Sequence, residues 1–267
     1  MNGQDASGAI RVAVKRKIFP AVGDREAQLV LQDIAFEVAP RSFLVITGPS
    51  GCGKSTLLRT LIGLLPPIAG EVRLFGEPVH ALSADDRRRL LQRTGTLFQH
   101  DALFGSMSIA DNVELPLRET TALPGQIIRE MAAIKLGLVG LGGLGQRMPA
   151  QLSGGQRKRA ALARATILDP ELVFCDEPSA GLDPAVAAGI DQTFLRMRAL
   201  FGSAFVIVTH EIASVRAIAD RGVFFHHGGV RADDRIAALV ASADPVVRGF
   251  FHREAPVPSN PSLARIS

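Results

Sequence analysis

Residues 48–55 read Gly-Pro-Ser-Gly-Cys-Gly-Lys-Ser, and this octapeptide decides the fold. Its spacing matches Gly-x-x-x-x-Gly-Lys-Ser/Thr, a pattern in which the backbone N–H groups of a glycine-rich loop surround phosphates. The apolar run 43–47 before it predicts a buried strand, and residues 55–62 after it predict the start of an amphipathic helix. A plain glycine turn between strand and helix is the weaker alternative, because four fixed positions occur in this context. We therefore predict a phosphate-binding loop.

The loop assigns a role to each side chain at its end. We expect Lys54 to bridge the β- and γ-phosphates of a nucleotide, the Ser55 hydroxyl to ligate Mg²⁺, and Thr56 to lie near the α-phosphate. The predicted nucleotide contacts are Gly48, Pro49, Ser50, Gly51, Cys52, Gly53, Lys54, Ser55 and Thr56.

A second glycine-rich stretch, residues 152–156, reads Leu-Ser-Gly-Gly-Gln and opens a helix predicted over 154–168. Glycines allow close approach of backbone N–H groups, and the positive end of the helix dipole favours an anion. We predict that this signature holds a γ-phosphate through Ser153, Gly154, Gly155 and Gln156. Because it contains neither a lysine nor a metal ligand, it is only half of a phosphate site.

The third motif is an apolar run followed by two carboxylates. Residues 172–175 form an apolar run typical of a buried parallel strand, and Asp176 and Glu177 come directly after it. Carboxylates at the carboxyl end of such a strand face the ligand crevice of an α/β sheet. We expect Asp176 to hold Mg²⁺, largely through water, and Glu177 to polarise an attacking water.

In this order the three motifs resemble the ATP-binding cassette (ABC) family, over about residues 10–240. The resemblance implies an ATPase that couples ATP hydrolysis to transport, with ATP and Mg²⁺ as cofactors. It implies an α/β P-loop NTPase fold with a mostly parallel core sheet, an antiparallel β subdomain and an α-helical subdomain.

The resemblance also implies roles for four further residues. Gln99 matches the Q-loop glutamine that contacts the metal, Asp183 belongs to the D-loop, and His210 matches the switch histidine that contacts the γ-phosphate. Phe19 stands where the family often stacks an aromatic ring on adenine, and core packing is equally open for it.

The family geometry implies a homodimer. The signature and the phosphate loop lie at opposite ends of one cassette, so each signature reaches the ATP of a second, head-to-tail copy, in trans. Length and patterning predict a single ATPase domain at 10–245, with a helical subdomain at about 100–168. Residues 246–267 are predicted to be an extension, either disordered or a dimer-contact arm.

Composition limits the remaining options. The apolar–polar alternation before residue 47, clearest at Ile34, Phe36 and Val38, predicts antiparallel strands. The sequence contains no run of about 18 apolar residues, so we expect no membrane span. Short basic clusters at 15–17, 87–89 and 157–159 predict solvated faces, and without Trp or Tyr we expect no nucleic-acid partner. Cys52 and Cys175 are expected to be reduced, buried thiols of a cytoplasmic protein.

Residues 98–124 distinguish between transporter classes. This segment resembles the ATPases of MCE-type (mammalian cell entry) lipid transporters, which include the maintenance-of-lipid-asymmetry (Mla) systems. That resemblance implies an integral membrane permease and an MCE-domain substrate-binding protein as partners. It places the chain peripherally on the cytoplasmic face of the inner (plasma) membrane.

Within the segment, Leu103, Phe104 and Met107 are candidates for an apolar groove that receives a permease helix, with core packing as the alternative. Gln156 and Leu182 keep the general ABC form, and Asp101 stands where a small residue is common. The ATPase of another importer, such as one for amino acids, and a soluble non-transport ABC ATPase are the alternative functions.

Overall fold

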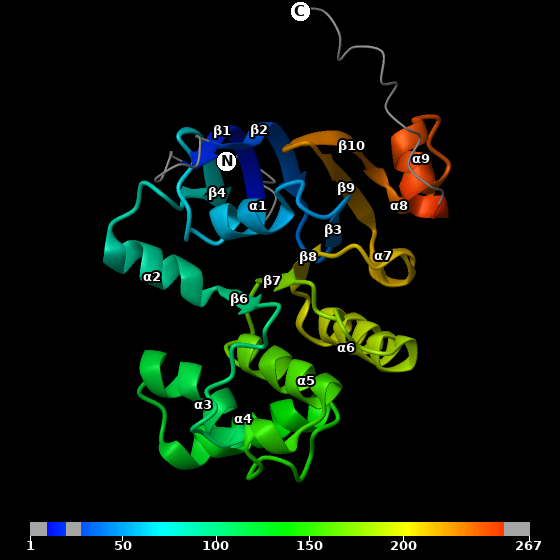
Figure 1. The fold of residues 1–267 in the computed structure, drawn as a ribbon. Coiled ribbons are helices and arrows are strands. Elements are labelled where there is room, and N and C mark those ends of the chain that lie inside the picture. Colours follow the sequence, from blue (N-terminus) through cyan, green and yellow to red (C-terminus); the bar gives the residue numbers. More distant parts are fainter. Residues whose placement is uncertain (1–9, 20–27, 254–267) are drawn as a thin grey trace, which may run out of the picture.

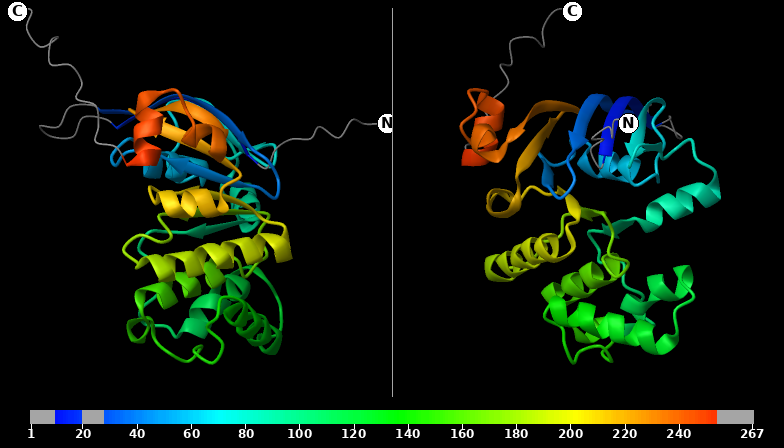
Figure 2. Two further views of the ribbon diagram at one scale, coloured as in Figure 1. Left: turned by 90° about the vertical axis from the view of Figure 1, so that its right-hand side faces the viewer. Right: turned by 180° about the vertical axis from the view of Figure 1, so that it is seen from behind.

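A six-stranded sheet, a four-stranded antiparallel sheet and a helical region make up the fold (Figure 1). The computed structural model describes residues 10–19 and 28–253. Seen from the side, the antiparallel sheet and the helical region lie at opposite ends of the molecule, and the six-stranded sheet extends from β10 beside the antiparallel sheet to β6 beside the helical region (Figure 2). This architecture contains the mostly parallel core sheet, the antiparallel β subdomain and the α-helical subdomain that we expect from the sequence.

The six-stranded core sheet has the order β10-β9-β3-β8-β7-β6, parallel except between β9 and β10. Every residue of β3, β7 and β8 is buried, which explains their unbroken apolar sequences. Because parallel strands end at one edge of a sheet, the segments after β3, β6, β7 and β8 converge there. The strands are β3 (Phe43–Thr47), β6 (Thr94–Leu97), β7 (Leu172–Asp176), β8 (Ala204–Val208), β9 (Arg221–His226) and β10 (Gly229–Arg235).

The antiparallel sheet has the order β2-β1-β4-β5. Ile34, Phe36 and Val38 on β2 are buried, as their alternation predicted, because one face of this sheet packs on the core and the other meets water. Its strands are β1 (Ile10–Phe19), β2 (Gln28–Val38), β4 (Ala69–Leu74) and β5 (Glu77–Pro78).

The helices outside the helical region lie near the two sheets. They are α1 (Lys54–Leu61), α2 (Ala84–Gln92), α6 (Pro184–Phe201), α7 (Ile212–Ile218), α8 (Ile236–Val240) and α9 (Pro245–His252). Helix α9 buries Val247 and Phe251, and Arg216 on α7 donates a hydrogen bond to the Phe251 carbonyl at 3.2 Å. The C-terminal extension predicted to begin at residue 246 therefore starts within a packed helix.

The helical region contains α3 (Ile109–Thr120), α4 (Gly125–Leu138), a 3-10 turn (Pro149–Gln151) and α5 (Gly154–Ala165). Helix α5 packs against α3 and α4 and also against β6 and α6, so it joins the helical region to the core sheet. It ends three residues before the predicted position 168. The left-handed Asp169 (φ 48°) and Pro170 follow and cannot continue a helix.

Three sequence expectations are wrong. Lys17 and Lys158 belong to clusters predicted to be solvated, yet both are buried. Lys17 donates to the Pro66 carbonyl, which lets its side chain satisfy a donor inside the protein. Cys52 is only half-buried, whereas Cys175 is buried; both thiols are free.

No helix in the ranges 10–19 and 28–253 combines the length and apolar character that spanning a bilayer requires.

Candidate functional site

The phosphate loop curls around its own lysine. Nζ of Lys54 donates hydrogen bonds to the carbonyls of Gly48 and Pro49, both at 2.8 Å. Gly48 has φ 142°, and a Cβ there would lie 2.0 Å from the Phe225 carbonyl oxygen, so only glycine fits. Helix α1 begins at Lys54 after Gly53, and no side chain caps it. The N–H groups of its first turn are therefore available to an anion.

Ser55 and Asp176 meet at the start of α1 and the end of β7. The Ser55 hydroxyl donates to Oδ1 of Asp176 at 3.3 Å. Burial raises the pKa of Asp176 above its ordinary value, the Ser55 hydrogen bond opposes this rise, and the charge of Glu177 adds to it. Mg²⁺ in nucleotide sites is held by one or two carboxylates or hydroxyls plus phosphate oxygens, and this pair fits that ligand set.

Glu177 occupies a strained position directly after β7. Its φ is +46°, and its N–H donates to the Val208 carbonyl at 2.8 Å. Oε1 lies 2.7 Å from Nδ1 of His210, while Oε2 is buried and has no hydrogen-bond partner among the described residues. Strain of this kind persists where the surroundings enforce it, often at functional sites.

Lys54, Ser55, Glu177 and His210 line one cleft of about 430 Å³, whereas the predicted residues Gly48 and Asp176 are not among its lining residues. Nine predicted residues line it, together with Val30 of β2, which no sequence pattern indicated. The nine are Ser50, Gly51, Gly53, Lys54, Ser55, Thr56, Gln99, Glu177 and His210. The structure thus gathers residues from four separate segments around Lys54.

A neighbouring hollow of about 310 Å³ also borders the phosphate loop. Burial raises the pKa of the Cys52 thiol at its edge. Pro49 and Cys52 line this hollow rather than the larger cleft, and Val30, Ser50 and Gly51 line both. The remaining lining residues are Leu29, His226, His227 and Gly228.

The signature residues 153–156 are not among the residues that line the cleft. Helix α5, which begins with them, lies in the other half of the molecule from α1 (Figure 1). Ser153 and Gln156 cap each other: the Gln156 N–H donates to Ser153 Oγ at 3.3 Å, and the Ser153 N–H donates to Gln156 Oε1 at 2.9 Å. A Cβ on Gly155 would lie 2.3 Å from Cγ1 of Val186 on α6.

Two further predicted residues lie outside the cleft. Asp183 caps α6, where its Oδ1 accepts hydrogen bonds from the N–H groups of Ala185 and Val186 at 3.1 and 3.0 Å. Phe19 is the last residue of β1, and its side chain lies outside the described part of the chain.

The predicted apolar docking residues differ in exposure. Phe104 is 51% exposed, while Leu103 packs against the core and Met107 is half-buried. The buried Asn112 on α3 fixes this loop, because its side chain bonds both the N–H and the carbonyl of Phe104, at 2.8 and 3.1 Å.

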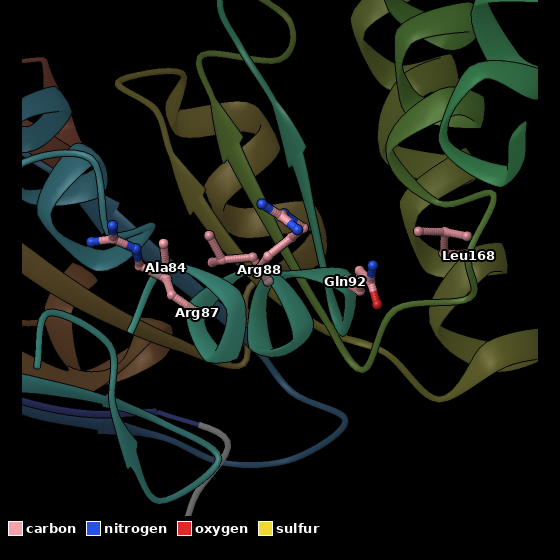
Figure 3. A pocket seen from close by; sticks show the side chains of 6 residues that line it. Ala84, Arg87, Arg88, Gln92 and Leu168 are labelled. Carbon is pink, nitrogen blue, oxygen red and sulfur yellow. The ribbon is translucent and has the colours of Figure 1, made fainter. Parts of the chain in front are cut away.

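A third hollow, of about 410 Å³, separates α2 from the turn after α5. Arg87, Arg88 and Gln92 lie along α2, with Leu168 on the opposite wall (Figure 3). It contains none of the predicted site residues.

Comparison with known proteins identifies the family. A family model described as "ABC transporter" matches residues 31–180. The chain belongs to the ABC transporter family. This ABC chain is 37% identical over 236 residues to the intermembrane phospholipid transport system ATP-binding protein MlaF of Escherichia coli K12, covering 88% of each.

A second relative is longer than this chain. The chain is 40% identical over 224 residues to the probable ribonucleotide transport ATP-binding protein mkl of Mycobacterium leprae, a match covering 84% of this chain and 64% of that protein. It therefore spans less than two thirds of that relative.

Solved ABC cassettes have the same fold, which confirms the predicted fold class, an ABC-type P-loop NTPase. The dimeric post-hydrolysis structure of the ATP-binding cassette MJ0796, bound to ADP and Pi, superposes with a TM-score of 0.77 at 29% identity. It covers 85% of this ABC chain and 98% of that one. A second dimeric structure of that bacterial cassette gives a TM-score of 0.78.

Proposed function

We propose that this chain is the ATP-binding and ATP-hydrolysing subunit of a membrane ABC transporter that moves phospholipid or a related hydrophobic substrate with an MCE-type complex. The observation that carries the ATPase part is the convergence of Lys54, Gln99, Glu177 and His210 on one cleft. A phosphate-binding loop, a carboxylate pair and a histidine at one edge of a parallel sheet suit phosphoryl transfer to water.

Each residue has a separate task in this proposal. Lys54 and the N–H groups of the loop bind and orient the phosphates, which supplies positioning and charge stabilisation. Ser55, Asp176 and Gln99 hold the metal. When bound, Mg²⁺ neutralises charge that develops on the phosphate oxygens.

Glu177 and His210 act on the attacking water. Glu177 accepts its proton as general base, and His210 holds Glu177 through Nδ1 and contacts the γ-phosphate. Removal of the γ-phosphate then ends the contacts that hold the site closed.

A second copy of the chain completes the site. The signature residues Ser153–Gln156 lie away from the cleft of their own chain, so they serve the nucleotide of a partner related by two-fold symmetry. Asp183, at the N-terminus of α6, would lie at the same interface. The solved cassette of similar fold is described as dimeric with ADP and Pi bound, which supports this arrangement.

The cargo follows from residues 98–124 and from the relatives. The segment resembles MCE-type ATPases, and one relative carries the name of a phospholipid transport protein. The M. leprae relative carries the name of a ribonucleotide transport protein, so a ribonucleotide is the competing cargo. A permease in the inner membrane, contacted near Phe104 from the cytoplasmic face, and an MCE-domain protein are the proposed partners.

Affinity purification tests the whole proposal. The tagged chain is extracted from its own membranes in mild detergent, and co-purifying proteins and lipids are identified by mass spectrometry. We expect a permease, an MCE-domain protein and bound phospholipid. Recovery of the chain without any integral membrane protein would overturn the transporter assignment, and a permease complex that binds ribonucleotide instead of lipid would overturn the cargo.

A further inference from the structure

One carboxylate, Asp101, joins the signature helix α5 to the segment that carries Gln99. Asp101 Oδ1 lies 3.0 Å from Nζ of Lys158, and Oδ2 lies 3.6 Å from Nε of Arg157. The side chains of Asp101 and Lys158 are only 14% and 6% exposed. Because water screens such a buried pair weakly, its attraction is stronger than that of a surface ion pair, and loss of one partner leaves a buried charge uncompensated.

Lys158 also contacts the Gln99 residue directly. Its Nζ donates a hydrogen bond to the backbone carbonyl of Gln99. One ammonium group therefore binds both the Asp101 carboxylate and the peptide group next to the Gln99 side chain, which lines the nucleotide cleft. Without the Asp101 carboxylate, Lys158 would lose its ion pair and could move away from the Gln99 carbonyl.

The backbone between these contacts adopts a conformation that needs support. Asp101 and Ala102 have φ values of +60° and +52°, in the left-handed region that non-glycine residues seldom occupy. Arg164, further along α5, donates to the carbonyls of Asp101 and Ala102 at 3.2 and 2.7 Å. Cations from α5 thus hold residues 99–102 at several points.

We infer that Asp101 is a positioning residue for Gln99: through Lys158 it fixes the Gln99 backbone and makes Gln99 and the signature move as one unit. The inference rests on the proposed ATPase function and deepens it. Helix α5 carries at its N-terminus the residues assigned to the partner's nucleotide and, one turn later, the lysine that places Gln99 in its own cleft. Asp101 therefore couples the two nucleotide sites of a dimer.

The chain contains a matched control for this ion pair. Asp169 contacts Lys135 at 2.6 Å, and the Lys135 side chain is also 6% exposed, so the lysines match, whereas Asp169 is 53% exposed and Asp101 14%. Asp169 shares the left-handed backbone of Asp101, with φ +48°, and follows the C-terminal end of α5. An Asn substitution keeps that backbone accessible at both positions, because Asn tolerates the left-handed region.

The first experiment uses hydrogen–deuterium exchange of the full-length chain without nucleotide. In Asp101→Asn we expect the amides of residues 98–104 to exchange about tenfold faster, equivalent to 1.4 kcal/mol of lost local protection. In Asp169→Asn these amides should keep the wild-type rate. Equal protection of residues 98–104 in wild type and Asp101→Asn would overturn the inference.

The second experiment measures steady-state ATP hydrolysis against Mg²⁺ concentration. Asp101→Asn should lower kcat or raise the half-saturating Mg²⁺ concentration about ten- to hundredfold, as loss of a group that orients a metal ligand does, whereas Asp169→Asn should do neither. In a Gln99→Ala background, Asp101→Asn should cost less than about twofold, because both changes act through one side chain.

An equal cost in both backgrounds, or equal effects of the two Asp→Asn variants, would overturn the role of Asp101. A wild-type chain that hydrolyses no ATP in its complex would instead refute the proposed function. The exchange experiment would still report on the ion pair, so the two failures are distinguishable.

Discussion

Oε1 of Glu177 lies 2.7 Å from Nδ1 of His210, and this contact joins the ends of two neighbouring strands of the core sheet. Glu177 follows β7 and His210 comes two residues after β8, which pairs with β7 in parallel. Oε2 of the same carboxylate is buried without a hydrogen-bond partner in the described residues. His210 thus engages one oxygen of Glu177, and the proposed role of Glu177 as a general base requires the other oxygen to become accessible to the attacking water.

Replacing Glu177 by Gln should separate binding from hydrolysis. The amide keeps the size of the side chain and its contact with His210, but it cannot act as a base. We expect kcat for ATP hydrolysis to fall about a hundredfold or more, with ATP affinity retained. The variant should accumulate as an ATP-dependent dimer, which size-exclusion chromatography with light scattering would detect.

Glu171 provides the control for this substitution. It immediately precedes β7, is exposed and pairs with Arg93 at 2.8 Å, so Glu171→Gln should leave the ATPase rate unchanged. An unchanged rate in Glu177→Gln would remove Glu177 from the role of base.

Lys54→Ala should abolish tight nucleotide binding. The Lys54 ammonium is the cation at the centre of the phosphate loop, and hydrogen bonds to charged groups contribute about 1.5–3 kcal/mol, so affinity should fall about ten- to hundredfold. Fluorescent-nucleotide titration measures this loss. Lys15→Ala, at an exposed position of β1, is the control, and wild-type affinity in Lys54→Ala would contradict the loop assignment.

Motifs with fixed local spacing could be predicted from the sequence. Residues 43–61 and 172–177 form the predicted strand, loop and helix and the predicted strand with two carboxylates, because apolar periodicity and glycine positions specify them locally. The family resemblance added Gln99 and His210 to the same cleft. The roles of all these residues stay predictions.

The ion pairs that hold the site could not be predicted. Lys158 follows the signature in a run of three basic residues, which resembles a solvated face, and only the packing of α5 against residues 99–102 buries it. Asp101 stood out solely as an unusual residue at its position. Contacts between segments distant in sequence leave no local pattern, and this is also why Val30 in the cleft was missed.

Gly155→Ala should destabilise the fold around the signature, because the added methyl group clashes with a neighbouring side chain whether or not phosphate is bound. Its Cβ would lie 2.3 Å from Cγ1 of Val186, a β-branched side chain that turns with difficulty. We expect overpacking to cost about 1–3 kcal/mol of unfolding free energy, measured by urea denaturation. Adding Val186→Ala should restore most of that stability. A double variant as unstable as Gly155→Ala alone would show that contact with Val186 is not the cause.

Asp191 should make stability depend on pH. It is buried on α6, and burial raises its pKa above the ordinary 3.8, with a hydrogen bond to Ser214 acting in the opposite direction. Between 3.8 and the raised value the folded state binds more protons than the unfolded state, so this carboxyl makes the unfolding free energy fall as pH rises through that interval.

Asp191→Asn should remove this part of the decline and be more stable than wild type at pH 7. Urea denaturation from about pH 4 to 7 tests this, with the exposed Asp85→Asn on α2 as control. Because the amide does not ionise, curves for Asp191→Asn that stay parallel to wild type would show that the carboxyl is not the source of the pH dependence.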